Sequence, residues 1–467
     1  MTKRIAATLV MCAFLGSRSM AESASPKTDK TDIETAISIG VNTAGFHILD
    51  EQMRGLIETA LAENPRLESA WTQSRSSFER VPQERSLSDP QLSYRYFAET
   101  PETRVGPQEH MLEFSQAVPW GGKRRLQGLR AENLGASRTW AAEDLERQLV
   151  ADLKRLYFET AYLQEALRVN DEEKELLRRF ESIALKRYST GQGIQQNVVK
   201  VQTEISRLDD RRTDLRRGSD VVARRLSERI GRPESALALD PIDLQLPEFE
   251  PHENDLEQAA LTNHPRIRAV EQRVAADEAW AKRRKLDTKP DFRFGIGYTL
   301  VGERTDLAGT VNPPEGNGDD ILGVTVGINV PLYRKRIHAG VSEAQESERA
   351  QRELLVAVQD RLRFEVQQAT IELDSLSERG RLYLEVIIPQ AEESLASAEA
   401  AYTTGRLTFL DLLDAERVLF QSRLAYHRLL ADLWISLADL ELAAARPIPS
   451  PDQERQGRTA YKTGRYR

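Results

Sequence analysis

Residues 291–300 have the sequence DFRFGIGYTL, and their pattern constrains the architecture more than any other segment does. Large apolar side chains alternate with small or polar ones, which is the period of a β-strand with one apolar face. The same alternation returns in residues 322–330, 92–96 and 112–118, where Gln116 interrupts the apolar face. Four strands of about 10 residues are therefore predicted, which is the length of a tilted strand that crosses ~30 Å of hydrocarbon.

Two placements of these strands are open. They could form two amphipathic hairpins that cover a soluble core. Against this, the opposite face is rich in Gly, Thr, Ser and Asn, which suits a water-filled lumen. An open sheet edge is not tolerated in lipid, so four spanning strands need neighbouring chains to close a barrel. Three chains would supply twelve strands, which suits a conduit better than the eight strands of two chains.

The composition excludes several other classes of protein. The 467 residues are 30% charged and 40% hydrophobic, with a mean hydropathy of −0.52. No apolar run approaches the ~20 residues of a spanning helix, so a polytopic helical membrane protein is excluded. A single Cys excludes a disulfide framework and a Cys-based zinc or iron–sulfur site. The net charge of −8 argues against a nucleic-acid partner, because such binding relies on basic patches.

The N-terminus predicts export. Lys3 and Arg4 precede a short apolar run that ends in small residues before Ala21. This is typical of a signal peptide over residues 1–21, cleaved near Ala21 and followed by an N-terminal segment over residues 22–49. Removing Cys12 with the signal leaves no Cys, which suits an oxidising compartment. A barrel-forming chain that is exported indicates a bacterial outer membrane.

The chain contains an internal duplication. Residues 60–67 (ALAENPRL) match residues 260–267 (ALTNHPRI), and residues 188–191 (YSTG) match residues 402–405 (YTTG) in the same order. The predicted units are a first repeat over 50–237 (hairpin 89–118, long helices 121–231), a Pro-rich linker over 238–249, a second repeat over 250–445 (hairpin 290–331, long helices 333–445) and a flexible tail over 446–467.

Long helices are predicted after each hairpin. From Val201 to Leu226 the heptad positions step by four and three residues, and the same spacing runs from Leu410 to Ala438. Sustained 3.5-residue periodicity indicates coiled-coil packing. A helix of ~65 residues would be ~100 Å long. The helices must therefore lie side by side in a rod or tube.

These features together resemble the TolC-like outer-membrane efflux proteins over about residues 50–445. Residues 402–415 (YTTGRLTFLDLLDA) are similar to the helix tip of the family's second repeat. Residues 115–124 (SQAVPWGGKR) resemble its strand-to-helix junction, in a form similar to the heavy-metal-efflux branch. The resemblance implies an α+β membrane protein and a homotrimer. In this trimer, a transmembrane β-barrel with four strands per chain would continue into a long α-helical coiled-coil barrel.

The resemblance also implies a function. The chain would be the outer-membrane channel of a tripartite efflux system, embedded in outer-membrane lipid and extending through the periplasm. It would passively export substrates, with heavy-metal cations favoured, that an inner-membrane pump and a periplasmic adaptor hand over. No cofactor is implied. The alternatives are a type I secretion or drug efflux conduit, and a periplasmic coiled-coil adaptor or scaffold whose hairpins belong to a soluble domain.

Four residues are candidates for a periplasmic gate. Asp411 and Asp414 are three residues apart and would form two rings of carboxylates in a trimer, a constriction that attracts cations. The alternative is that they are ordinary acids in the first turn of a helix. By the resemblance, Tyr402 and Asn197 would hold the closed tip. Their alternatives are helix-end packing for Tyr402 and an N-terminal cap for Asn197.

Other candidates lie at the helix turns and the strand ends. Gly191 and Gly405 would supply the backbone freedom of a tight helix reversal. By the resemblance, they would form the adaptor-docking turns together with Arg406 and Leu407. Leu407 departs from the basic residue that some family members carry there. Two prolines, Pro119 and Pro331, would end strands and start helices.

No catalytic residues are predicted. The six His are scattered, without the spacing of a zinc site. Residues 121–124 (GGKR) lack the spacing of a phosphate-binding loop. The sequence therefore predicts a protein that is not an enzyme and that holds no metal of its own.

Overall fold

The computed structural model describes residues 50–234, 237–247 and 252–447. The predicted signal peptide over 1–21, the segment over 22–49 and all but two residues of the predicted tail lie outside the described residues, as do residues 248–249 of the predicted linker. Residues 237–247 form no helix or strand.

Helices make up most of the described chain. The longest, α6, has 67 residues and is therefore about 100 Å long. In chain order the helices are α3 Glu51–Glu63, α4 Pro65–Phe78, α5 Arg80–Arg85, α6 Lys123–Ser189, α7 Gln195–Ile230, α8 Glu253–Asn263, α9 Pro265–Lys285, η2 Leu286–Thr288, α10 Leu307–Val311, α11 Arg334–Leu382, the π-helical turn η3 Tyr383–Ile387, α12 Ile388–Thr403 and α13 Phe409–Ala444.

The strands form one antiparallel sheet. They are β1 Gln91–Tyr96, β2 Glu102–Thr103, β3 Gly106–Val118, β4 Phe292–Val301 and β5 Ile321–Ile328. The order is β1-β3-β4-β5, and the two-residue β2 pairs with β3. The mixed helix and strand class predicted from the sequence is confirmed. The predicted uniform strand length is wrong, because β1 has 6 residues and β3 has 13.

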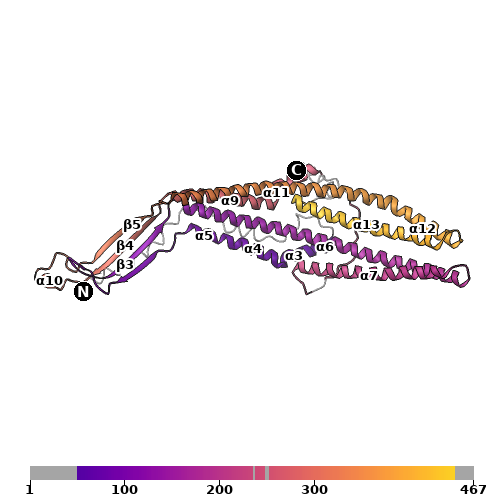
Figure 1. The fold of residues 1–467 in the computed structure, drawn as a ribbon, viewed down its shortest axis with the longest axis horizontal. Coiled ribbons are helices and arrows are strands. Elements are labelled where there is room, and N and C mark those ends of the chain that lie inside the picture. The colour runs from indigo at the N-terminus through magenta and orange to yellow at the C-terminus, as the bar shows by residue number, and fades with distance from the viewer. Residues whose placement is uncertain (1–49, 235–236, 248–251, 448–467) are drawn as a thin grey trace, which may run out of the picture. The chain divides into compact units, whose positions relative to one another are not determined.

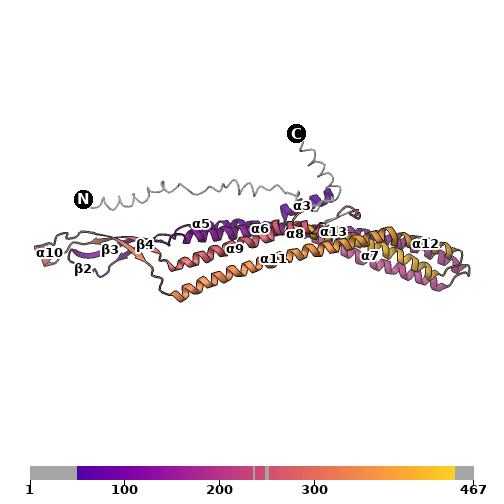
Figure 2. The same cartoon turned by 90° about the horizontal axis from the view of Figure 1, so that it is seen from above.

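The sheet and the helix turns lie at opposite ends of the long helices. Figure 1 shows the strands continuing from one end of α6 and α11, while the α6–α7 turn and the α12–α13 turn lie near each other at the other end. Figure 2 shows the same placement from above. The central sheet contact, β3 with β4, joins the two repeats.

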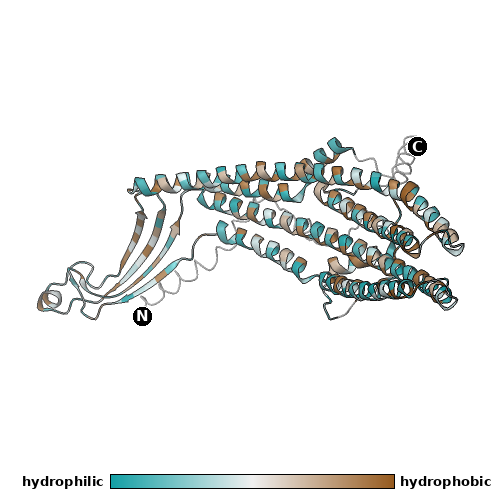
Figure 3. Ribbon diagram, turned by 45° about the vertical axis from the view of Figure 1, so that its right-hand side comes forward, coloured by the Kyte–Doolittle hydropathy of each residue, from teal (hydrophilic) through white to brown (hydrophobic). Residues whose placement is uncertain are grey.

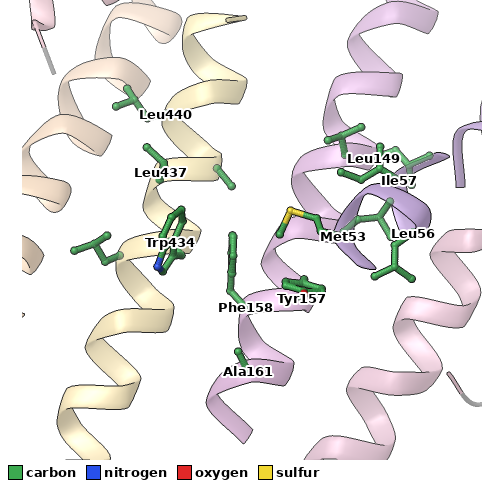
Figure 4. Close-up of a cluster of buried hydrophobic side chains, with 14 of the residues drawn as sticks. Met53, Leu56, Ile57, Leu149, Tyr157, Phe158, Ala161, Trp434, Leu437 and Leu440 are labelled. Carbon is green, nitrogen blue, oxygen red and sulfur yellow. The ribbon is translucent and has the colours of Figure 1, made fainter. Parts of the chain in front are cut away.

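Two buried clusters form the core between the helices. One lies near the middle of the helices, where the Phe158 ring packs 5.5 Å from Trp434 and 5.9 Å from Tyr157 (Figure 4). Trp434 also donates its indole N–H to the Gln245 carbonyl at 3.1 Å, so its polar atom is satisfied in the core. The second cluster extends toward the helix turns and includes Leu412 and Tyr402.

Most heptad positions of α7 and α13 lie in these clusters. Val201, Leu208 and Leu226 are buried on α7. Leu410 was predicted to be a core position of α13, and that prediction is wrong, since its side chain is 55% exposed. Leu412 and Leu413 are buried in its place.

The second helix of each repeat, α4 and α9, begins with a side-chain cap. The capping residue differs between the two repeats. The Asn64 side chain accepts hydrogen bonds from the backbone N–H groups of Arg66 and Leu67 at 2.9 and 3.1 Å. His264 accepts from the Arg266 N–H at 3.1 Å through Nδ1. Burial lowers the pKa of His264 to about 4, so its ring is neutral and can accept. Each cap is followed by a proline at the first helical position.

The long helix of the second repeat is interrupted where that of the first repeat is continuous. Proline 389 follows the π-helical turn η3, Tyr383–Ile387. A proline has no N–H, and its ring crowds the carbonyl four residues earlier, here that of Glu385 inside the turn. The wider turn accommodates this crowding without ending the helix.

The pattern of hydropathy differs between the sheet and the long helices. Along the strands hydrophobic and hydrophilic residues alternate, while the helices carry mixed stripes (Figure 3). None of the helices in the described part of the chain is both long and apolar enough to cross a bilayer.

The burial of α13 generates a test with two neighbouring leucines. Leu412→Ala should lower the free energy of unfolding by about 3 kcal/mol, because the side chain is 1% exposed and its removal leaves a cavity. Leu410→Ala should cost less than about 1 kcal/mol. Thermal and denaturant unfolding followed by circular dichroism measures both. Equal losses would contradict the exposed position of Leu410.

Candidate functional site: the helix turns, the interface between repeats and the sheet

The two helix turns have the same backbone geometry. Gly191 and Gly405 have φ of +73° and +75°, in the left-handed region where a glycine avoids strain. In each turn the glycine N–H bonds to the carbonyl of the motif tyrosine at 3.0 Å. The next N–H bonds back to the residue before that tyrosine at 2.9 Å. These bonds satisfy carbonyl groups at the helix ends, so both turns are closed at their C-terminal side.

The tyrosines of the two turns differ in environment. Tyr188 is 48% exposed, whereas Tyr402 is 4% exposed and packs against Phe409, with ring centroids 5.5 Å apart. Arg187 joins the turns, because its Nη1 donates to the Tyr402 carbonyl at 2.6 Å and its guanidinium lies 4.7 Å from the ring. Sequence reasoning missed Arg187. Its position directly before the first YxxG motif was the available signal.

Asp411 has a local structural role. Thr408 is the N-cap of α13, and its hydroxyl accepts a hydrogen bond from the Asp411 N–H at 3.3 Å. The Asp411 carboxylate in turn accepts from the Thr408 hydroxyl at 2.6 Å and from its N–H at 3.2 Å. This reciprocal capping box stabilises the start of α13. The geometry therefore supports the ordinary first-turn role for Asp411 within one chain.

Asp414 is exposed and paired. It forms an ion pair with Arg417 one turn further along α13, and both side chains are 62% exposed. Asp411 and Leu410 lie on the same exposed side of the helix. The predicted acids thus share one solvent-facing surface, but Arg417 offsets the charge of Asp414.

Among the described residues, the hydrogen bonds and ion pairs of the two acids go to Thr408 and Arg417 and not to the remaining tip residues. Asn197 lies in the first turn of α7, but the N-cap is Ile194 and no side chain caps that helix. The alternative prediction that Asn197 is the cap is therefore wrong. Arg406 is exposed, and Leu407 is half-buried against the apolar cluster near the turns.

Opposite charges link α6 of the first repeat to α13 of the second. Lys154 and Glu441 form a buried ion pair, with side chains 4% and 5% exposed. Three further pairs follow toward the helix turns. In order they are Arg155–Asp439, Glu159–Arg428 and Glu172–Arg423.

One contact of this interface joins two acids. Glu173 of α6 and Glu416 of α13 are buried and hydrogen-bonded to each other, and Arg211 donates to Glu173 at 3.0 Å. Oε1 of Glu416 has no hydrogen-bond partner among the described residues. Burial, with the neighbouring Glu173 charge, raises the pKa of Glu416 to about 8. The pair therefore shares a proton at neutral pH.

The junction between sheet and helices has a charged clamp. The Lys123 ammonium is buried and lies 2.8 Å from Oδ1 of Asp291, which also accepts the Trp120 N–H at 2.7 Å. Burial alone would raise the pKa of Asp291, but these two hydrogen bonds hold it below its ordinary value. Pro119 and Pro331 lie between strand and helix, since α6 begins at Lys123 and α11 at Arg334.

The sheet separates apolar from small and polar residues row by row. Leu92, Phe114, Ile296 and Val324 form one row across the four long strands, and all four side chains are at least 37% exposed. The next row is Ser93, Glu113, Gly297 and Gly323. One face of the sheet is therefore apolar and unburied, and the opposite face is mostly small or polar.

No cluster of His, Cys, Asp and Glu within the described ranges could hold a metal ion.

The shared proton generates a pH prediction. A carboxyl whose folded pKa lies above its unfolded value stabilises the fold at low pH and loses that contribution as pH rises through the folded pKa. Between pH 5 and pH 8.5 the wild-type protein should lose stability on the order of 2–4 kcal/mol at this site. Glu416→Gln should remove that loss and match the wild type at pH 5. Melting temperature against pH measures it, with the exposed Glu393→Gln as control. Parallel profiles for wild type and Glu416→Gln would contradict the shared proton.

Comparison with known proteins identifies solved structures that share this fold. No curated protein sequence matches the chain. Three solved structures share the fold: the outer membrane protein VceC of Vibrio cholerae, the transmembrane channel protein CusC and the outer-membrane channel OprN. Their TM-scores are 0.71, 0.72 and 0.70, at 17%, 17% and 19% identity. The matches cover 86%, 85% and 91% of this chain and 97%, 93% and 97% of the others. Residues 256–446 match the family model described as outer membrane efflux protein, so this part of the chain is similar to that family.

Proposed function

We propose that the chain is one of three identical subunits of an outer-membrane duct, the passive exit channel of a tripartite efflux system. The observation that carries the proposal is the sheet, whose apolar face is exposed while its opposite face is mostly small or polar. Such a sheet buries its apolar side only in lipid or against another protein. The small and polar side suits a water-filled lumen.

The sheet edges support the trimer. Among the described strands, β1 and β5 each pair on one side only. An unpaired edge is not tolerated in hydrocarbon, so β1 of one subunit would pair with β5 of the next. Three subunits close a barrel of twelve long strands, wide enough for an aqueous channel. The long helices would then form a tube in the periplasm.

The helix turns are the proposed contact with the rest of the system. The turns around Gly191 and Gly405 are closed, and they expose Arg406 and Leu410. We place adaptor docking there, together with Leu407, and assign the energy of transport to an inner-membrane pump. OprN and VceC are described as outer-membrane proteins, which agrees with the proposed outer-membrane location.

Asp411, Asp414, Tyr402 and Asn197 are the proposed gate. The two acids lie on an exposed surface of α13, so three copies could face one axis. Rings of carboxylates attract cations, which favours heavy-metal cations as substrates. Drug efflux and type I secretion are the alternatives. Metal and drug sensitivity after deletion of the gene would separate metal from drug export, and unchanged metal tolerance would contradict our preference.

Cell fractionation tests the membrane placement. The mature protein should remain in the outer-membrane fraction and require detergent for extraction, because the apolar sheet face is otherwise exposed to water. Native mass spectrometry of the extract should give a trimer. Recovery of a soluble periplasmic protein without detergent would support the adaptor or scaffold alternative instead.

The gate is tested by removing charge while keeping the helix cap. Asp411→Asn with Asp414→Asn should raise single-channel conductance and reduce cation preference several-fold in planar bilayers. Asparagine can still accept hydrogen bonds at the start of α13. The control is Asp214→Asn, since Asp214 forms the same exposed pair, with Arg217, on α7. Conductance and selectivity equal to those of the control would contradict the gate.

A further inference from the structure

A basic pocket lies directly beyond the end of β3. Its volume is about 310 Å³, and its lining includes Arg85, Trp120, Gly121, Arg124 and Arg125. The lining is thus strongly positive. A side chain at Gly121 would meet no atom within 4 Å, so the pocket is open at that position.

The arginines of this pocket are only partly neutralised. Arg85 forms an ion pair with Glu132 at 2.6 Å. Arg124 donates to the Arg85 carbonyl at 2.9 Å, and within the described residues neither Arg124 nor Arg125 forms an ion pair. The N-terminus of α6 also borders the pocket and has no side-chain cap, which adds partial positive charge. Two guanidinium groups remain available for an anion, and Arg recognises phosphate through paired N–H donors.

The pocket is continuous with the apolar face of the sheet. The Trp120 ring stacks on Phe292 with centroids 5.9 Å apart, and Phe292 stacks on Phe294 at 6.2 Å. Phe294 and Ile296 are exposed on the apolar face. A molecule in the pocket would therefore have apolar surface on one side and cations on the other. Tryptophan is typical of this level of a membrane, where hydrocarbon meets the headgroups.

The second repeat repeats this order of residues. After β5, the exposed Tyr333 is followed by Arg334, Lys335 and Arg336, which are also exposed. The Arg336 guanidinium lies 6.0 Å from the Tyr333 ring. Both strand-to-helix junctions thus place an aromatic ring next to a basic cluster. This is the arrangement expected at the plane of anionic headgroups.

From these observations we infer that the pocket of Arg85, Trp120, Arg124 and Arg125 binds the phosphodiester headgroup of an anionic glycerophospholipid in the periplasmic leaflet. The acyl chains would lie along Trp120, Phe292 and Phe294. The inference rests on the proposed membrane placement. It adds a lipid site that anchors the junction at a fixed depth, beyond the general contact of the sheet with hydrocarbon.

Native mass spectrometry of the full-length protein in detergent tests the site. The probes are phosphatidylglycerol, phosphatidylcholine and inorganic phosphate, titrated separately. We expect phosphatidylglycerol to bind on the order of tenfold more tightly than phosphatidylcholine, because Arg attracts a net anionic headgroup. Arg124→Gln with Arg125→Gln should abolish that preference. Arg124→Lys with Arg125→Lys should retain part of it, which separates loss of charge from misfolding.

The matched control is Arg224→Gln with Arg225→Gln, an adjacent exposed pair on α7 far along the chain from the sheet. It should bind phosphatidylglycerol like the wild type. Equal lipid binding by the pocket variant and the control would overturn the inference, and so would full competition by inorganic phosphate, which would indicate a simple anion site. Those outcomes leave the proposed duct intact. A protein that is soluble without detergent would instead overturn the proposed function.

Discussion

The pairing of β3 with β4 is the interaction on which the rest of the architecture depends. It joins the two repeats in one sheet, and it continues to the end of β3 and the start of β4, where Val118 lies opposite Phe292. There Asp291 accepts from the buried Lys123 ammonium and from the Trp120 N–H. The change from strand to helix in the first repeat is thereby fixed to the start of the strand in the second. Breaking the ion pair would leave a buried charge without its main partner, which is costly.

The helices are held to the same register by charge as well as by the apolar clusters. The pairs from Lys154–Glu441 to Glu172–Arg423 require α6 and α13 to lie antiparallel at one setting, because a shift by one turn would separate each cation from its acid. The Glu173–Glu416 contact lies at the end of this series and joins two acids. It stabilises the same register only while the two carboxyl groups share a proton. Loss of this proton at high pH would therefore weaken the interface at its end near the helix turns.

The fold was predictable where a pattern depends on one segment of the chain alone. The alternation from Phe292 to Leu300 predicts β4, and the heptads from Val201 to Leu226 predict a helix whose inner side is buried. Sequence reasoning failed where two distant segments define the environment. Leu410 fits the heptad but is exposed, because the capping box of Thr408 and Asp411 fixes the first turn of α13. Glu416 was one acid among 73 acidic residues until α6 placed Glu173 against it. Lys123 was noticed as part of a motif, but its partner Asp291 lies in the other repeat.

The duplication also shows that two copies of one motif can lie in different environments. The YxxG turns have matching backbone bonds, yet Tyr402 is buried under Arg187 while Tyr188 is exposed. The helix after the second turn begins with a capping box, whereas α7 begins at Ile194 without a side-chain cap. An uncapped first turn leaves N–H groups for water and frays at lower cost. If the proposed tube opens at its turns, the uncapped start of α7 can therefore move with a smaller loss of interactions than the capped start of α13.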